Sequence, residues 1–146
     1  MSGLAARQAE LVAALVAGAA MPEGFDAGRV AAAREALLRK RAGEVRRAWP
    51  ELAASQGDWW RATFAEWAAG RAPQGSLRDG WDLARHLAAG SRLPAGAARE
   101  LAVREVQWRY DGRSAPRRRV LPALRRTPGT IAIQLAGRVY ATTTSS

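Results

Sequence analysis

The stretch that decides the expected fold runs from Arg39 to Trp67 and has the sequence RKRAGEVRRAWPELAASQGDWWRATFAEW. Apolar residues in and just before its first half recur at alternating spacings of four and three, the periodicity of a helix with one apolar face. They are Leu38, Ala42, Val45, Trp49 and Leu52. Because a proline disfavours helical geometry in the residue before it, Pro50 should end or sharply bend this helix at Trp49.

The second half of the stretch predicts a helix with an aromatic face. Asp58 is placed to cap its first turn. Trp60, Phe64 and Trp67 follow at positions i, i+4 and i+7, which puts the three rings on one side of the helix. We therefore expect these rings in a small helical core, and we expect Trp59, which lies beside that stripe, at the surface.

Helical periodicity continues on both sides of this stretch. The helix before Pro50 is predicted to run from Asp26 to Ala48, and further helices are predicted from about Leu4 to Val16, from Ser76 to Gly90 and from Pro94 to Asp111. In the N-terminal helix, Leu4, Leu11 and Leu15 should face inward. Asp26 is a candidate N-cap, and Ser76 followed by Asp79 resembles a capping box. Five helices with short connectors predict a compact all-α bundle.

The character of the sequence changes after residue 112. Residues 113–119 are basic and poorly suited to regular structure, and residues 120–126 are ambiguous. Residues 130–135 and 138–142 are both β-prone, and the Ala-Gly step between them can form a turn, so a β-hairpin is predicted.

Ile131, Ile133 and Leu135 would share one face of the first hairpin strand, because side chains alternate along a strand. An isolated hairpin is only marginally stable in water, so we expect this apolar face to dock on the bundle. The predicted fold is therefore mainly α, a five-helix bundle followed by a C-terminal β-hairpin. Residues 1–112 would form the bundle and residues 113–146 a basic linker plus the hairpin, packed on the bundle as one unit.

The composition excludes several kinds of chemistry. The chain has no cysteine, which removes disulfides, thiolate nucleophiles and thiolate metal sites together. His86 is the only histidine; Asp82 precedes it by one turn, but no nucleophile stands in a recognisable arrangement with it. His86 is therefore expected to be an exposed helical residue, and we expect no catalytic residue, no metal site and no cofactor in this chain.

Nothing in the sequence predicts a membrane protein. No apolar run reaches the ~20 residues that a transmembrane helix needs. Arg7, Gln8 and Glu10 interrupt the alanine-rich start at the point where a signal peptide would be continuously apolar. A cytoplasmic protein without membrane contact is expected.

The formal net charge of +10 has two explanations. One is an anionic partner, such as nucleic acid or an acidic peptide. The other is coding bias, because Lys40 is the only lysine among 23 basic residues and the chain is rich in alanine and glycine, as a GC-rich genome would produce. The places where arginine concentrates are therefore more informative than the total charge.

The first concentration of arginine lies on the helix before Pro50. Arg39, Arg46 and Arg47 lie opposite the apolar stripe, and with Trp59 they form a candidate docking surface for a protein partner. A solvated helix face without a partner is the alternative.

The second concentration of arginine lies beside the hairpin, whose outer edges are open to a further strand. An extended peptide could pair with such an edge, and guanidinium groups could grip its acidic side chains. The candidate peptide-binding residues are Arg117, Arg118, Arg119, Arg125, Arg126, Ile131, Ile133, Leu135, Val139 and Tyr140.

Several short motifs occur in an order that resembles a known family. They are Trp49-Pro50-Glu51-Leu52, Gly57-Asp58-Trp59-Trp60, Ser76-Leu77-Arg78-Asp79-Gly80, and Leu101-Ala102 followed by Glu105 and Trp108. Over residues 4–110 this order is similar to the HvfC/BufC (MbnC-like) N-terminal domain family. The resemblance implies a non-catalytic partner of a multinuclear non-haem iron-dependent oxidase that modifies ribosomally synthesised peptides. It also implies that the partner binds the oxidase and the leader of the precursor peptide, and that the iron belongs to the oxidase.

Within that hypothesis the bundle would dock on the oxidase and the hairpin with its basic approach would hold the leader. The alternative from a different class is a DNA-binding module that uses the arginine-rich surface. Helix-turn-helix geometry would distinguish the two, and the segment from Trp49 to Asp58 is long for such a turn. A structural subunit with no peptide ligand is a third alternative.

Overall fold

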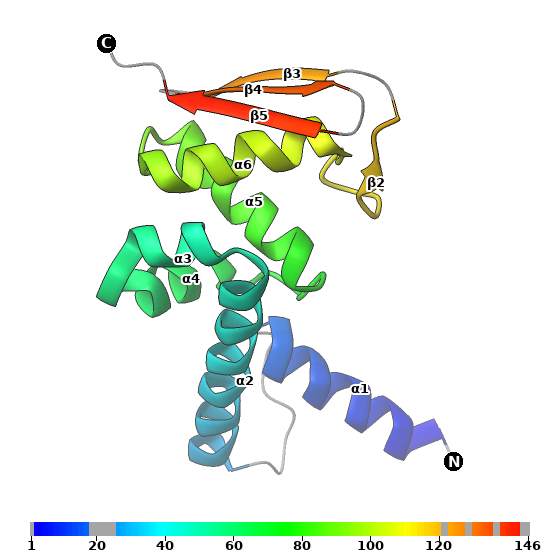
Figure 1. Cartoon of the computed structure of the whole chain (residues 1–146). Helices are drawn as coiled ribbons and strands as arrows, with labels where there is room; N and C mark the ends of the chain where they lie inside the picture. The colour runs from blue at the N-terminus through cyan, green and yellow to red at the C-terminus, as the bar shows by residue number, and fades with distance from the viewer. Residues whose placement is uncertain (1, 18–25, 121–122, 128–129, 136–137, 144–146) are drawn as a thin grey trace.

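The computed structural model describes residues 2–17, 26–120, 123–127, 130–135 and 138–143. It is mainly helical and ends in antiparallel strands, which confirms the predicted fold class (Figure 1). The helices are α1 (Ser2–Ala17), α2 (Ala27–Ala48), α3 (Pro50–Gln56), the 3-10 turn η1 (Gly57–Trp59), α4 (Trp60–Ala68), α5 (Ser76–Ala89) and α6 (Ala95–Gln107). The strands are β1 (Trp108–Arg109), β2 (Arg117–Arg118), β3 (Ala123–Thr127), β4 (Thr130–Leu135) and β5 (Arg138–Thr143).

The chain turns sharply between α2 and α3. Asp26 caps α2 as predicted, because its side chain accepts a hydrogen bond from the Arg29 backbone N–H at 2.9 Å. At the other end Pro50 does end α2, but it then becomes the first residue of α3, a position that proline favours. Glu100 of α6 accepts a hydrogen bond from the Leu52 backbone N–H at 2.8 Å and so caps this short helix from outside. The sequence predicted only a connector here.

The aromatic core lies where α2 to α5 meet. Trp60, Phe64 and Trp67 are buried together, as their spacing predicts. Trp49 is fully buried, meets Trp81 edge to face with 5.7 Å between ring centroids, and donates its indole N–H to the Leu77 carbonyl at 3.0 Å. The predicted Asp58 cap is wrong, because Asp58 lies inside η1 and α4 begins only at Trp60.

A largely buried ion pair joins α2 to α5. The Arg41 Nε donates to Asp79 Oδ2 at 2.7 Å, and the Gln74 backbone N–H donates to the other carboxylate oxygen at 3.1 Å. The predicted capping box is therefore wrong: α5 starts at Ser76 without a side-chain cap, and Asp79 faces the core instead. Its carboxylate makes the buried guanidinium of Arg41 tolerable, since an unpaired buried charge is strongly unfavourable.

Helix α1 packs against α2 at the edge of the bundle (Figure 1). Ala14 is fully buried, and the Arg34 Nε of α2 donates to its carbonyl at 2.6 Å. Leu11 and Leu15 are half-buried, but Leu4 is 70% exposed, so the inward orientation predicted for Leu4 is wrong. The packing on α2 covers only the C-terminal part of α1.

The C-terminal strands form a three-stranded antiparallel sheet in the order β3-β4-β5, which lies over α6 (Figure 1). β4 and β5 are the predicted hairpin, in which Leu135 pairs with Arg138. β3 is an additional strand within the segment that the sequence left ambiguous. A separate short ladder pairs β1, directly after α6, with β2 in the basic linker.

The sheet packs on α6 with the face opposite to the one expected. Ala132 and Gln134 are buried against the helix, whereas Ile131 and Ile133 are only half-buried. The prediction that the isoleucine face docks on the bundle is therefore wrong. α6 presents Ala102 and Val106 to the sheet, and small side chains on both sides let helix and strands approach closely. The Leu135 side chain lies outside the described residues.

No helix among the described residues combines the length and the apolar character that a bilayer crossing requires.

Candidate functional site

The two outer strands of the sheet present edges that pair with no other strand among the described residues. Residues 128 and 129 separate paired Thr127 and Thr130, and residues 136 and 137 separate paired Leu135 and Arg138. In such two-residue hairpins the flanking pair is hydrogen-bonded, and hydrogen-bonded and non-bonded pairs then alternate.

This alternation identifies the backbone groups that each edge offers. On β3, the N–H and C=O groups of Leu124 and Arg126 point away from β4. On β5, those of Val139 and Ala141 point away from β4. Each edge can therefore form a further antiparallel or parallel ladder with an extended peptide.

The sheet face that points away from α6 carries an apolar row across all three strands. Leu124, Ile133 and Tyr140 are paired neighbours in this row, and Leu124 and Tyr140 are 61% and 58% exposed. Arg126 is exposed and pairs with Ile131 in the adjacent row. A peptide on the β3 edge would thus meet apolar side chains and one guanidinium. The Arg125 side chain lies outside the described residues.

The two arginines of β2 are exposed, whereas Arg119, which follows them, is hydrogen-bonded to backbone carbonyls. Arg117 and Arg118 of β2 are exposed, and the Arg118 guanidinium lies 5.3 Å from the centroid of the Trp108 ring. Arg119 instead donates from Nε to the carbonyls of Glu105 and Trp108 at 3.2 and 3.1 Å. These bonds fasten the linker to the end of α6.

Further bonds fasten the start of the linker to α5. The Arg78 Nη2 donates to the Arg113 carbonyl at 2.6 Å, and the Tyr110 hydroxyl donates to Asp82 at 2.9 Å. Burial raises the pKa of the Asp82 carboxyl. Backbone N–H groups of Ser114 and Arg113, at 2.7 and 2.8 Å, hold the pKa of Asp111 down at about 2. The segment that the sequence predicted to be irregular is therefore anchored at both ends.

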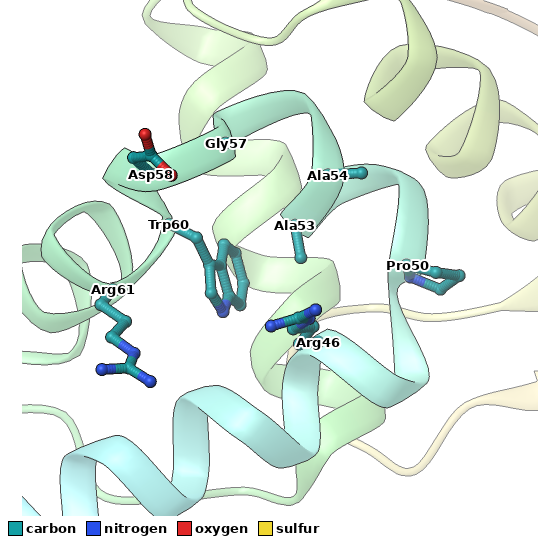
Figure 2. Close-up of a pocket in the computed structure, with 8 residues that line it drawn as sticks. All are labelled: Arg46, Pro50, Ala53, Ala54, Gly57, Asp58, Trp60 and Arg61. Carbon is teal, nitrogen blue, oxygen red and sulfur yellow. The ribbon is translucent and has the colours of Figure 1, made fainter.

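A second candidate surface is a hollow of about 640 Å³ at the corner between α2, α3 and α4 (Figure 2). Its lining residues are Arg46, Pro50, Ala53, Ala54, Gly57, Asp58, Trp60 and Arg61. The Trp60 ring belongs to the core and its indole N–H reaches the Ala42 carbonyl at 3.3 Å, so this wall of the hollow is fixed. We call this feature the α2–α4 hollow.

The predicted docking residues separate around the hollow. Arg46 lines it, and Trp59, 75% exposed, lies in the chain between two lining residues, Asp58 and Trp60. Arg39 lies about two turns away along α2 and faces Glu35 at 4.0 Å, and Arg47 is exposed. Arg61 was not predicted from the sequence as part of this surface. Its only signal in the sequence was its position directly after Trp60. The proximity of α4 to α2, which brings Arg61 to the hollow, is a tertiary feature that local sequence does not show.

Among the described residues no group of three or more His, Asp or Glu side chains is placed to hold a metal ion. His86 is exposed on α5, as predicted, and its Nε2 lies 3.3 Å from the Arg92 Nη2.

Comparison with known proteins places the helical part of the chain. The family model "SCO6045-like, C-terminal domain" matches residues 5–89, which contain most of α1, all of α2 to α5 and the α2–α4 hollow. A UPF0276 protein of Streptomyces avermitilis is 37% identical over 116 residues, which are 79% of this chain and 24% of that relative. The chain thus spans about a quarter of the relative's length. No solved structure matches the chain.

These matches overturn the resemblance to the HvfC/BufC (MbnC-like) N-terminal domain family, because they assign a different family. The motifs that suggested it are mainly signals of helix boundaries and close packing. Pro50, for example, starts α3, and Gly80 lies against the Trp49 ring. Such features recur in unrelated helical domains. With 85 of its residues inside the matching range 5–89, this chain belongs to the SCO6045-like, C-terminal domain family.

Proposed function

We propose that this chain is a non-catalytic recognition module that binds an extended peptide and presents it to a separate peptide-modifying enzyme. The peptide is the leader of a ribosomally synthesised precursor, and the enzyme is a multinuclear non-haem iron oxidase that carries the iron itself. The observation that carries the peptide half of this proposal is the three-stranded sheet with two open edges.

The edge of β3 is the better of the two edges for an acidic peptide. Exposed Arg126 lies on β3 itself, and exposed Arg117 and Arg118 precede this strand in the chain, in the separate β1–β2 ladder. Backbone pairing to Leu124 and Arg126 would supply affinity, and charge-assisted hydrogen bonds from the guanidinium groups would select carboxylates. The apolar row through Leu124 would take alternate apolar side chains of the peptide.

The proposed enzyme partner is supported by the domain's place in its relative. The Streptomyces avermitilis protein joins a region like this one to about three times as much additional polypeptide. A domain of this kind therefore occurs alongside a larger protein, which fits a module that works beside an enzyme. The substrate and the iron chemistry of that enzyme remain part of the proposal.

Proline substitutions on the two edges test the peptide half. Leu124→Pro removes an outward N–H from β3, and Ala141→Pro removes one from β5, while neither removes a hydrogen bond to β4. Peptides selected from a random display library against the unmodified chain serve as the probe, and fluorescence anisotropy measures their affinity. We expect Leu124→Pro to weaken binding roughly tenfold and Ala141→Pro to leave it unchanged.

Leu124→Ala is the matched control, because it removes the exposed side chain but keeps the N–H group. If Ala141→Pro weakened binding and Leu124→Pro did not, the site would lie on β5. If both proline variants bound the peptides as tightly as the unmodified chain, strand pairing would be refuted. Charge reversal of Arg117 and Arg118 should weaken acidic peptides selectively. An equal loss of affinity for random duplex DNA would favour the DNA-binding alternative instead.

A reconstituted reaction tests the enzyme half. The oxidase should modify its precursor peptide far faster when this chain is added, and metal analysis should find iron in the oxidase. Stoichiometric iron in the separately purified chain would contradict the non-catalytic role.

A further inference from the structure

The α2–α4 hollow combines an apolar wall with exposed positive charge. Pro50, Ala53 and Ala54 provide small apolar groups on one side (Figure 2). In the same view the Trp60 ring lies between the side chains of Arg46 and Arg61. Arg46 comes from the last turn of α2 and Arg61 from the first turn of α4, so two different elements bring their guanidinium groups to the same hollow.

The charge of these two arginines is not neutralised by the fold. Ion pairs among the described residues involve Arg39, Lys40, Arg41, Arg85 and Arg104. Neither Arg46 nor Arg61 takes part in one, and both are exposed. In Figure 2 the Asp58 side chain, the one carboxylate in the lining, points away from both. The hollow therefore carries two exposed guanidinium groups that pair with no carboxylate among the described residues.

Trp59 adds a large exposed aromatic surface and lies in the chain between two lining residues of the hollow, Asp58 and Trp60. Its side chain is 75% exposed, whereas the next residue, Trp60, is buried. Tryptophan and arginine are the side chains that most often dominate the binding energy of protein interfaces. The exposed tryptophan and the two unpaired arginines together have the composition of an interface centre.

We propose that the α2–α4 hollow is the docking site for an acidic segment of a protein partner. Asp or Glu carboxylates of that segment would bind the guanidinium groups of Arg46 and Arg61, and Trp59 would pack over its apolar side chains. A phosphate backbone fits less well, because the apolar wall of Pro50, Ala53 and Ala54 offers it nothing.

The inference rests on the proposed function in one respect, which is that the partner is the enzyme to which the peptide is presented. The hollow and the sheet belong to different parts of the molecule. The hollow is formed by α2, α3, η1 and α4, whereas the sheet lies on α6 (Figure 1). The enzyme and the peptide can therefore be bound at the same time.

The experiment uses a defined protein as the probe. The part of the Streptomyces avermitilis relative outside the matching residues is produced as a separate protein, and its affinity for the full-length chain is measured by biolayer interferometry. We expect Trp59→Ala and the double variant Arg46→Glu/Arg61→Glu each to weaken binding by about tenfold or more. We also expect the double variant to lose most of the salt dependence of binding.

Arg29→Glu is the matched control. Arg29 is exposed on the same helix and lies about 26 Å from Arg46 along its axis, so its charge reversal should leave the affinity unchanged. Arg46→Gln/Arg61→Gln provides a milder variant, and thermal unfolding checks that all variants fold.

The outcomes separate the docking site from the proposed function. Normal affinity of the Trp59 and double variants would refute the hollow as the docking site and leave the peptide function standing. No binding of the unmodified chain would refute both the docking site and the enzyme partner. Loss of the display-selected peptides in these variants would also refute a separate docking site. If the variants lost duplex DNA instead of the protein probe, the ligand would be nucleic acid and the inference would fall.

Discussion

Of the described glycines, Gly80 has the least room for a side chain. A Cβ atom built on it would lie 2.1 Å from Cδ1 of Trp49, a distance that packed atoms do not adopt. Trp49 cannot move away easily, because it is fully buried and its indole N–H is bonded to Leu77. The absence of a side chain at Gly80 therefore lets α5 pass directly over the ring at the junction of α2 and α3.

Gly80→Ala should consequently destabilise the chain by about 2–3 kcal/mol, through overpacking against Trp49. Gly43→Ala is the control, because Gly43 also lies in a helix but a Cβ there meets nothing within 4 Å. It should stabilise the chain by about 0.5–1 kcal/mol through the lower flexibility of the unfolded state. Urea unfolding measures both, and equal effects would contradict the packing argument.

The Asp111 carboxylate makes the stability of the turn at residues 111–114 depend on pH. Its pKa is lowered to about 2 from the ordinary 3.8 because three groups of Arg113 and Ser114 donate to the carboxylate. A lowered pKa means that the ionised carboxylate stabilises the turn above pH 3.8 and that this contribution is lost as the pH falls toward about 2.

Ser114→Ala removes the hydroxyl donor but keeps both backbone donors. The pKa of Asp111 should therefore rise but stay below 3.8. Carbon-detected NMR titration of the carboxyl measures this shift. An ordinary pKa in the unmodified chain would show that the turn does not hold the carboxylate.

Residue roles that depend on local spacing were predictable from the sequence, and roles that depend on a distant partner were not. The core positions of Trp60, Phe64 and Trp67 follow from helical periodicity alone. Arg41 resembles its exposed basic neighbours in sequence, and its ion pair with Asp79, 38 positions away, is a tertiary contact that no local pattern contains.

At the scale of elements, alternation in β4 predicted which residues share a face but not which face is buried. The larger apolar side chains, Ile131 and Ile133, suggested that their face is buried. The close packing of Ala132 against Ala102 and Val106 of α6 buries the other face instead. α3 was missed for a related reason. Its cap comes from Glu100 on another helix, so the local sequence holds no cap signal for it.

The orientation of β4 makes a prediction that opposes the simple hydrophobic pattern. Ala132→Leu should cost about 2 kcal/mol, because the added carbons have no space between β4 and α6. Ile133→Ala should cost only about 1 kcal/mol, since its side chain is half-buried, whereas a core isoleucine would cost about 2–5 kcal/mol. Chemical denaturation measures both, and the opposite ranking would reverse the assignment of the faces.

At the scale of the whole molecule, the fold class was predictable because each helix carries its own periodicity. The two candidate surfaces were only partly predictable. The open strand edges follow from a C-terminal hairpin, but the third strand that carries Arg126 became evident only through its pairing with β4. The α2–α4 hollow requires the packing of α4 on α2, which brings Arg61 to Arg46 and which no local pattern contains.

Helix α6 belongs to both halves of the molecule. Ala97 and Leu101 take part in the bundle core, while Ala102 and Val106 support the sheet. Helix α6 therefore fixes the distance between a peptide bound to the sheet and a protein partner bound at the α2–α4 hollow. If one residue were inserted into or deleted from a bound peptide, a different side chain would reach the active site of the partner enzyme. Binding at the sheet edge and binding at the α2–α4 hollow would both be unchanged.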